Sequence, residues 1–214
     1  EGDVFEHTLL ALDRAAELGP TDPDERRTLL FATLCHDFGK PATTRRRRGR
    51  ITAYAHDAVG GPIARDFLER LRAPRALAEQ AEALTRRHLA PALYPRQGAK
   101  RAAYRRLARE MAAAGTTLET LLRVATADQL GRSTEAAFSG RFPEGKIFRE
   151  QAEAAGVFRE PPKDVVTGRH VLARGIPSGK AVGRILDRSR EVQDASAETD
   201  PEKILDRVIS KGAP

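Results

Sequence analysis

The 214-residue sequence predicts an all-α protein. Apolar residues recur at spacings of three and four along most of the chain, which is the period of an amphipathic helix. Proline, glycine and capping residues fall where these apolar patterns begin and end. No stretch of strict apolar–polar alternation is long enough to build a sheet. We therefore expect a helical body over residues 1–140 and a small helical tail over residues 141–214.

The first two helices are predicted near the start of the chain. The first should end at Gly19-Pro20, and Asp22-Pro23 is typical of a helix start, with a capping residue followed by proline at the first helical position. The apolar run that follows predicts a second helix that continues to Gly39. The first helix should bury one face of apolar residues at helical spacing, namely Val4, Phe5, Leu9, Leu12 and Ala16.

In the middle of the chain, a run of basic residues and several prolines separate the predicted helices. Residues 45–49 are predicted to form a basic loop, and residues 51–54 a short non-helical stretch, either an extended loop or a brief strand. Helical spacing resumes at about Ala58, and Pro74 should open another helix. The prolines at positions 91 and 95 are expected to break the next stretch.

Helical patterns continue to the end of the chain. Residues 99–114 form a basic amphipathic pattern, and Thr116 to Glu119 resembles a capping box at the start of a more apolar helix that we expect to be central. A further helix is predicted over about 144–155. The tail should contain three short helices, over residues 165–173, 180–192 and 201–210.

Composition limits the class of protein but does not decide it. The chain has 37 basic and 30 acidic residues, a formal charge of +7 that suits a polyanionic partner or reflects a GC-rich genome. One cysteine excludes an internal disulfide and suits a reducing compartment, so we expect a cytoplasmic protein. No apolar run is long enough to cross a membrane. Because the only methionine is Met111, we expect a piece of a longer chain.

Histidine and aspartate supply the strongest functional signal. His36 is followed directly by Asp37, and Asp128 lies within an apolar helix, where a carboxylate is costly unless a cation or hydrogen bonds satisfy it. A metal held by imidazoles would satisfy it, although a single histidine is more often a surface or core residue. Imidazole with carboxylate suits Mn, Fe, Co, Ni or Zn better than Mg.

Four segments together resemble a known family. They are Gly2-Asp3-Val4-Phe5-Glu6-His7-Thr8, Leu34-Cys35-His36-Asp37-Phe38-Gly39-Lys40-Pro41, Asp128 with Gly131-Arg132, and Thr167-Gly168-Arg169-His170 with Gly183-Arg184-Ile185-Leu186. In these segments the chain resembles the HD superfamily of metal-dependent phosphohydrolases, and most closely the HD domain and following helical segment of bacterial tRNA nucleotidyltransferases (CCA-adding enzymes) and their poly(A) polymerase relatives. On this resemblance residues 1–140 are an HD domain, an all-α bundle.

The resemblance implies a site for one or two divalent metal ions. A first ion would be bound by His7, His36, Asp37 and Asp128, and a second by His56 and His88, with Asp37 bridging. Asp37 and Lys40 would be catalytic. Lys40 could instead be a helix-terminal cation, and Arg132 could pair with Asp128. The candidate contacts to substrate phosphate are Lys40, Arg132, Arg87 and Arg46.

The implied reaction is hydrolysis of a 2′,3′-cyclic phosphate, a 2′-phosphate or a related phosphoester on a nucleotide or RNA 3′ end, including tRNA. One alternative is a non-catalytic tRNA-binding body, because no motif of a nucleotidyltransferase head is found in the chain. Another HD chemistry, such as triphosphohydrolase or 5′-nucleotidase activity, also stays open. The Gly-Tyr-Pro signature of enzymes that cleave cyclic di-GMP is absent, which disfavours that substrate.

Overall fold

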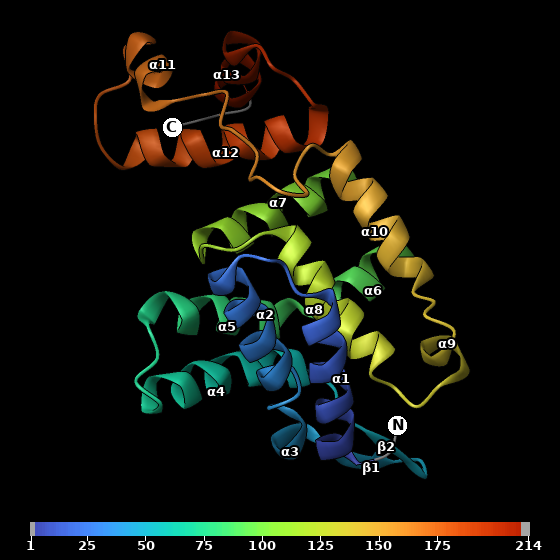
Figure 1. Ribbon diagram of the computed structural model, residues 1–214. Coiled ribbons are helices and arrows are strands. Elements are labelled where there is room, and N and C mark those ends of the chain that lie inside the picture. Colours follow the sequence, from blue (N-terminus) through green and yellow to red (C-terminus); the bar gives the residue numbers. More distant parts are fainter. Residues whose placement is uncertain (1–2, 211–214) are drawn as a thin grey trace.

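The computed structural model describes residues 3–210 and confirms the all-α class (Figure 1). Gly2 of the first motif lies outside the described residues. Within them, the one sheet is a hairpin of β1 (Arg45–Arg47) and β2 (Arg50–Thr52). The helices are α1 (Val4–Leu18), α2 (Pro23–Cys35), α3 (Lys40–Thr43), α4 (His56–Arg70), α5 (Arg75–Arg87), α6 (Ala90–Arg96), α7 (Arg101–Ala113), α8 (Leu118–Leu130), α9 (Glu135–Phe138), α10 (Pro143–Ala154), α11 (Gly168–Ala173), α12 (Lys180–Ser196) and α13 (Pro201–Ile209).

The body is built around α8, the apolar helix that we expected to be central. It packs against α1, α2, α5, α6, α7 and α10, and runs through the middle of the body in Figure 1. Leu121, Val124 and Ala127 are fully buried in the main apolar cluster. A carboxylate on this helix, at Asp128, is therefore also buried, as the sequence predicted. None of the helices in the described chain is long and apolar enough to cross a bilayer.

The buried face of α1 differs from the predicted one. Phe5 is 70% exposed and Leu9 is 48% exposed, whereas His7, Ala11 and Ala15 are buried. The reason is that α1 packs closely against the end of α8. A Cβ atom added at Gly131 would lie only 2.6 Å from the backbone nitrogen of Ala11. Small residues permit this approach, and the face that carries them also turns His7 inward.

The second helix ends earlier than expected, at Cys35 and not at Gly39. The chain turns through His36 and begins the short helix α3 at Lys40, with Pro41 in its first turn, where the missing proline N–H costs nothing. Gly39 lies at this turn against α4, and a Cβ atom there would lie 2.0 Å from the carbonyl oxygen of His56. The turn therefore brings the His-Asp pair directly against the start of α4.

The predicted basic loop over residues 45–49 is a β-hairpin instead. Arg45, Arg46 and Arg47 pair antiparallel with Thr52, Ile51 and Arg50. The two turn residues, Arg48 and Gly49, have φ of 49° and 78°, as the two-residue turns of tight hairpins require. The second strand overlaps the brief strand that was one of the two expectations for residues 51–54. The first strand was not indicated, because arginine is a weak signal for a strand and β1 has only three residues.

Two smaller expectations about helix ends were also wrong. Pro91 and Pro95 do not interrupt a helix, because both lie within α6. This helix is short, so the two prolines remove few backbone hydrogen bonds. The cap of α8 is Thr117, whose Oγ1 accepts a hydrogen bond from Thr120 N at 3.1 Å. Thr116 therefore does not form the expected capping box with Glu119.

The tail helices α11, α12 and α13 enclose a second apolar cluster that includes Val171, Ile185 and Ile204. The main cluster extends through α10 as far as Phe158, and the second cluster begins at Val165. The two cores are thus separate along the sequence, while α12 also contacts α7. The division into an HD domain over residues 1–140 and a helical segment over residues 141–214 stays a prediction.

Candidate metal centre

Six side chains from five helices converge inside the body. His7 is on α1, His36 and Asp37 follow α2, His56 opens α4, His88 follows α5, and Asp128 is near the end of α8. Five of these residues are buried, and His56 is half-buried, with 14% of its side chain exposed. The structure therefore brings together all six residues predicted as metal ligands: His7, His36, Asp37, His56, His88 and Asp128.

One group surrounds the Nε2 atoms of His7 and His36, which lie 3.2 Å apart. His7 Nε2 is 3.2 Å from Asp128 Oδ1, and His36 Nε2 is 3.2 Å from Asp37 Oδ2. His7, His36 and Asp37 offer donor atoms that all lie within 4.8 Å of one another. Two imidazoles and the Asp37 carboxylate thus face a common point, and Asp128 adjoins them through His7 Nε2.

A second group shares Asp37 with the first. His56 Nε2 lies 3.4 Å from Asp37 Oδ1 and 3.3 Å from His88 Nε2. Asp37, His56 and His88 also have donor atoms within 4.8 Å of one another. Asp37 therefore presents one carboxylate oxygen to each group, which is the arrangement of a bridging ligand.

The proton position on each imidazole is set by a backbone carbonyl. The Nδ1 atom of His36 lies 2.7 Å from Thr33 O, that of His56 lies 2.8 Å from Ala53 O, and that of His88 lies 2.7 Å from Thr85 O. His7 Nδ1 lies 3.2 Å from Gly131 O. Because a carbonyl only accepts, each Nδ1 carries a hydrogen, and Nε2 is the ring nitrogen that faces the cluster.

These carbonyl acceptors were missed by the sequence reasoning. Three of them share one signal, because the acceptor stands three residues before its histidine: Thr33, Ala53 and Thr85. Each pair lies at a helix end, where carbonyl or amide groups lack partners within the helix. The fourth acceptor, Gly131, is distant in sequence and required the packing of α1 on α8.

The donor set fits divalent transition metal ions. Two unprotonated nitrogens that face each other at 3.2 or 3.3 Å repel unless a metal cation or a proton lies between them. Nitrogens bound tetrahedrally at about 2.0–2.1 Å from one ion lie roughly 3.3–3.4 Å apart, which agrees with both pairs. Among the described residues, Asp37 Oδ2 is also buried with no hydrogen bond of acceptable geometry, although Lys40 Nζ lies 2.6 Å away as an ion pair.

Charge within the cluster favours ionised carboxylates. Burial alone would raise the pKa of Asp37, but His36 and Lys40 hold it well below its usual range. The pKa of Asp128 is lowered in the same way by His7, His36 and Arg132. Burial and the nearby His36 lower the pKa of His88 to about 4, which keeps this imidazole neutral and able to bind a metal. Metal ligation requires these protonation states.

The four candidate phosphate contacts lie at different places. Lys40 is next to the cluster through Asp37, and Arg132 forks onto Asp128 at 3.0 and 3.2 Å, the pairing that was the alternative to phosphate contact. Arg87 is paired with Glu110 at 2.8 Å. Arg46 is on the exposed hairpin. Only Lys40 and Arg132 therefore adjoin the six residues, and contact of any of the four with phosphate stays a prediction.

A hollow of about 570 Å³ leads to the cluster between α1, α3 and the hairpin. Its lining residues are Val4, His7, Lys40, Thr44, Ile51, Thr52 and Ala53. One cluster member, His7, and the Asp37 partner Lys40 lie on its wall. A substrate phosphate that enters this hollow would therefore meet both the imidazole edge of the cluster and a cation.

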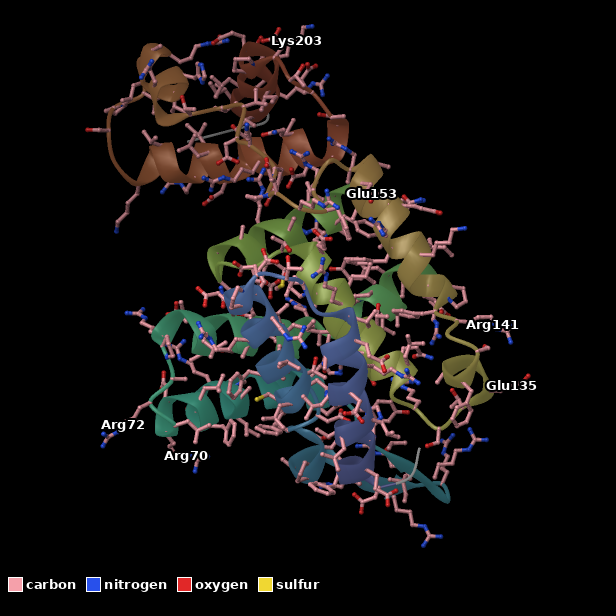
Figure 2. All side chains as sticks on the ribbon, in the orientation of Figure 1. Arg70, Arg72, Glu135, Arg141, Glu153 and Lys203 are labelled. Carbon is pink, nitrogen blue, oxygen red and sulfur yellow. The ribbon has the colours of Figure 1, made fainter. Side chains whose placement is uncertain are left out.

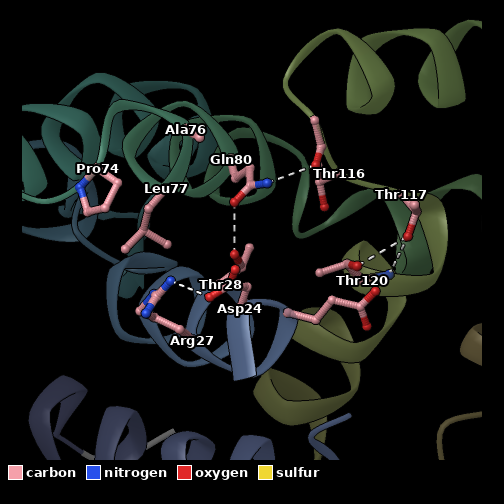
Figure 3. Close-up of a pocket in the computed structure, with 12 residues that line it drawn as sticks. Asp24, Arg27, Thr28, Pro74, Ala76, Leu77, Gln80, Thr116, Thr117 and Thr120 are labelled. Carbon is pink, nitrogen blue, oxygen red and sulfur yellow. Dashed lines mark hydrogen bonds and ion pairs between the residues drawn. The ribbon is translucent and has the colours of Figure 1, made fainter. Parts of the chain in front are cut away.

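Another hollow, of about 300 Å³, lies at the opposite end of α2 (Figure 3). There Thr28 donates to Gln80, and Gln80 donates to Gly115 O, both at 2.8 Å. No predicted site residue lines it. Cys35, beside His36, is fully buried, and burial raises the pKa of its thiol to about 12, so it is a core residue and not a ligand.

The fold and the cluster agree with comparison to known proteins. The family model described as HD domain matches residues 4–129, and the chain belongs to this family. The matched region contains all six clustered residues.

Among named relatives, the chain is 33% identical over 190 residues to the A-adding tRNA nucleotidyltransferase of Deinococcus radiodurans. This match covers 86% of this chain and 41% of that protein. It is 32% identical over 200 residues to the CC-adding tRNA nucleotidyltransferase of Thermus thermophilus, covering 89% of this chain and 41% of that protein. The multifunctional CCA protein of Alkalilimnicola ehrlichii is 42% identical over 89 residues, 42% of this chain and 20% of that protein. The chain thus spans about two fifths of the first two relatives. No solved structure matches.

Proposed function

We propose that the chain is a metal-dependent phosphohydrolase that acts on phosphoesters at RNA or nucleotide 3′ ends, with 2′,3′-cyclic phosphates and 2′-phosphates as its substrates. One observation carries the proposal. Four imidazoles, each with its hydrogen tied to a backbone carbonyl, direct their free nitrogens at two carboxylates inside an HD domain. A purely structural core has no need for six such groups at one point.

Two ions would be held by the two groups that share Asp37. His7, His36, Asp37 and Asp128 would hold the first ion, and His56 and His88 would hold the second with Asp37. Imidazole and carboxylate together favour Mn, Ni, Co, Fe or Zn over Mg. Bound metal supplies Lewis acidity toward a phosphoryl oxygen and activates water as the nucleophile.

The remaining roles belong to the chain itself. Lys40 Nζ, on the wall of the hollow, would pair with a non-bridging phosphate oxygen while it keeps Asp37 ionised. Arg132 holds the Asp128 carboxylate in place through three hydrogen bonds, one from Nε and two from Nη2. Phosphate contacts by Arg87 and Arg46 would come from farther along a substrate, because both side chains lie outside the cluster.

The test is turnover of 2′,3′-cyclic AMP and of a 2′-phosphorylated nucleotide after loading with each divalent metal in turn. Asp37→Asn keeps the shape of the side chain and removes the shared charge, so kcat should fall by at least ~10³-fold if both ions depend on it. Asp66→Asn, an exposed carboxylate on α4, is the matched control and should keep wild-type activity. Equal activity in the Asp37 variant would refute the assignment.

A second candidate function is a tRNA-binding body without turnover. The observation that favours it is the similarity to tRNA nucleotidyltransferases, of which this chain spans only part. It predicts tRNA affinity that falls steeply with salt and no metal-dependent hydrolysis of any nucleotide. A nucleotide panel that shows no turnover, while metal analysis finds no bound ion under saturating Mn or Ni, would favour this function over the first.

A further inference from the structure

The hairpin β1–β2 carries an unusual concentration of charge. Arg45, Arg46, Arg47, Arg48 and Arg50 are all exposed. Many arginines elsewhere are paired with a carboxylate, as Arg65 is with Glu69. Among the described residues, no ion pair joins any of the five hairpin arginines to an aspartate or glutamate. Their charges therefore face solvent together.

The register places most of this charge on one face. Residues directly opposite each other in an antiparallel pair share a face, as do alternate residues along a strand. Arg45 therefore lies on the same face as Arg47, Arg50 and Thr52. Arg47 and Arg50 are directly opposite, and like charges in that position destabilise a hairpin. An anion bound across this face would remove the repulsion.

The turn residue Arg48 is a second place where the hairpin has an arginine although another residue would stabilise the backbone better. Arg48 has a φ of 49°, a left-handed conformation that costs a residue with a Cβ roughly 1–2 kcal/mol and that asparagine or glycine adopts more easily. The chain nevertheless has arginine at the tip. Beside the strands, Tyr54 is 69% exposed, and the Arg47 guanidinium lies 5.7 Å from the centre of its ring.

The arginine face continues from the wall of the hollow that leads to the metal cluster. Thr52, on that face, lines the hollow together with His7 and Lys40, and Ile51 of the other face lines it as well. From Thr52 to the tip the strand extends for about 10 Å, at ~3.3 Å per residue. A surface of this length can contact a short run of backbone phosphates along one strand.

We infer that the hairpin is the docking surface for single-stranded RNA, holding the nucleotides on the 5′ side of the terminal phosphoester while the 3′ end enters the hollow. The arginine face binds backbone phosphates, and Tyr54 offers a ring on which a base stacks, a contact that does not depend on base identity. The inference deepens the proposed function and rests on it for the direction of the strand. It makes an oligonucleotide the substrate, in preference to a free mononucleotide.

The test compares two double variants in the full chain. Arg47→Gln with Arg50→Gln removes the facing pair and the repulsion within it, so the hairpin keeps its fold. Arg70→Gln with Arg72→Gln removes two exposed charges at the far end of α4, where both side chains point outward (Figure 2). Both lower the net charge equally, so a general effect of charge changes both alike.

Binding is measured by fluorescence anisotropy with a labelled 12-nucleotide single-stranded RNA that ends in a 3′-phosphate, across a range of salt. The hairpin variant should bind about tenfold more weakly, and the slope of log affinity against log salt should become shallower by about 1.4, at ~0.7 per phosphate lost. The α4 variant should keep the wild-type affinity and slope. Equal losses in the two variants, or tighter binding of an acidic peptide than of RNA, would overturn the inference.

Kinetics separate this inference from the proposed function. The ratio of kcat/KM for an oligonucleotide with a 2′,3′-cyclic end over that for 2′,3′-cyclic AMP should fall about tenfold in the hairpin variant. If the wild-type protein turns over neither substrate, the proposed function fails, while the anisotropy still decides whether RNA docks on the hairpin. Turnover with an unchanged ratio and unchanged anisotropy would instead leave the function and remove the docking surface.

Discussion

At the residue scale, the six clustered side chains were predictable and their orientation was not. His7, His36-Asp37 and Asp128 stand in short motifs whose order along the chain is itself the signal. The backbone partners of the imidazoles carry no such signal, because any residue has a carbonyl. The pairing of His7 with Gly131, in particular, exists only once α1 lies on α8.

Two glycines offer a direct test of close packing at this scale. A methyl group at Gly39 would lie 2.0 Å from the His56 carbonyl, so Gly39→Ala must push α3 away from α4 and should lower stability by about 1–3 kcal/mol. Gly183 on α12 has no atom within 4 Å of such a methyl, and Gly183→Ala should raise stability by ~0.5–1 kcal/mol. Urea unfolding of the two variants checks both signs. A Gly39→Ala protein as stable as wild type would contradict the packing described.

At the element scale, the helices were predicted more accurately than the hairpin and the buried face of α1. The central position of α8 followed from its apolar sequence, and α10 was expected within a residue or two of its bounds. A brief strand was one of the two expectations near β2, whereas β1 was missed because it is three residues long and consists of arginine. The buried face of α1 was misassigned because close helix contact selects Ala11 and Ala15 over the larger Phe5 and Leu9.

The contact between α12 and α7 depends on buried charge. Arg105 Nε lies 2.6 Å from Asp194 Oδ1, with 8% and 3% of the side chains exposed. Asp194→Asn removes the negative partner and leaves a buried guanidinium, so stability should fall by roughly 3–5 kcal/mol. Limited proteolysis should also cut the tail earlier than in wild type.

A surface pair provides the contrast for this prediction. Arg149 and Glu153 are about half exposed on α10, and Glu153→Gln should change stability by no more than ~1 kcal/mol. If thermal unfolding shows similar losses for Glu153→Gln and Asp194→Asn, the charge at Asp194 does not anchor the tail.

At the scale of the whole molecule, the cluster joins α1 and α8 to the ends of α2 and α5 and the start of α4. A ligand that binds only the folded state stabilises it, by ~2.7 kcal/mol at a free concentration one hundred times its Kd. Saturating Mn²⁺ or Ni²⁺ should therefore raise the Tm of the wild-type protein, and EDTA should reverse the change. Asp37→Asn should lose most of this increase, whereas Asp66→Asn should keep it. The same rise in both variants would place the bound metal elsewhere.

The carbonyls that stand three residues before His36, His56 and His88 have a consequence for metal uptake. Each of these imidazoles is hydrogen-bonded to a carbonyl of the turn that contains it, so the rotation of the ring is already restricted when the helix end forms. The entropy of ordering the ligands is then lost during folding and not during binding. Capture of the ion should accordingly be fast, with a rate set by its entry and dehydration and not by reorganisation of the protein.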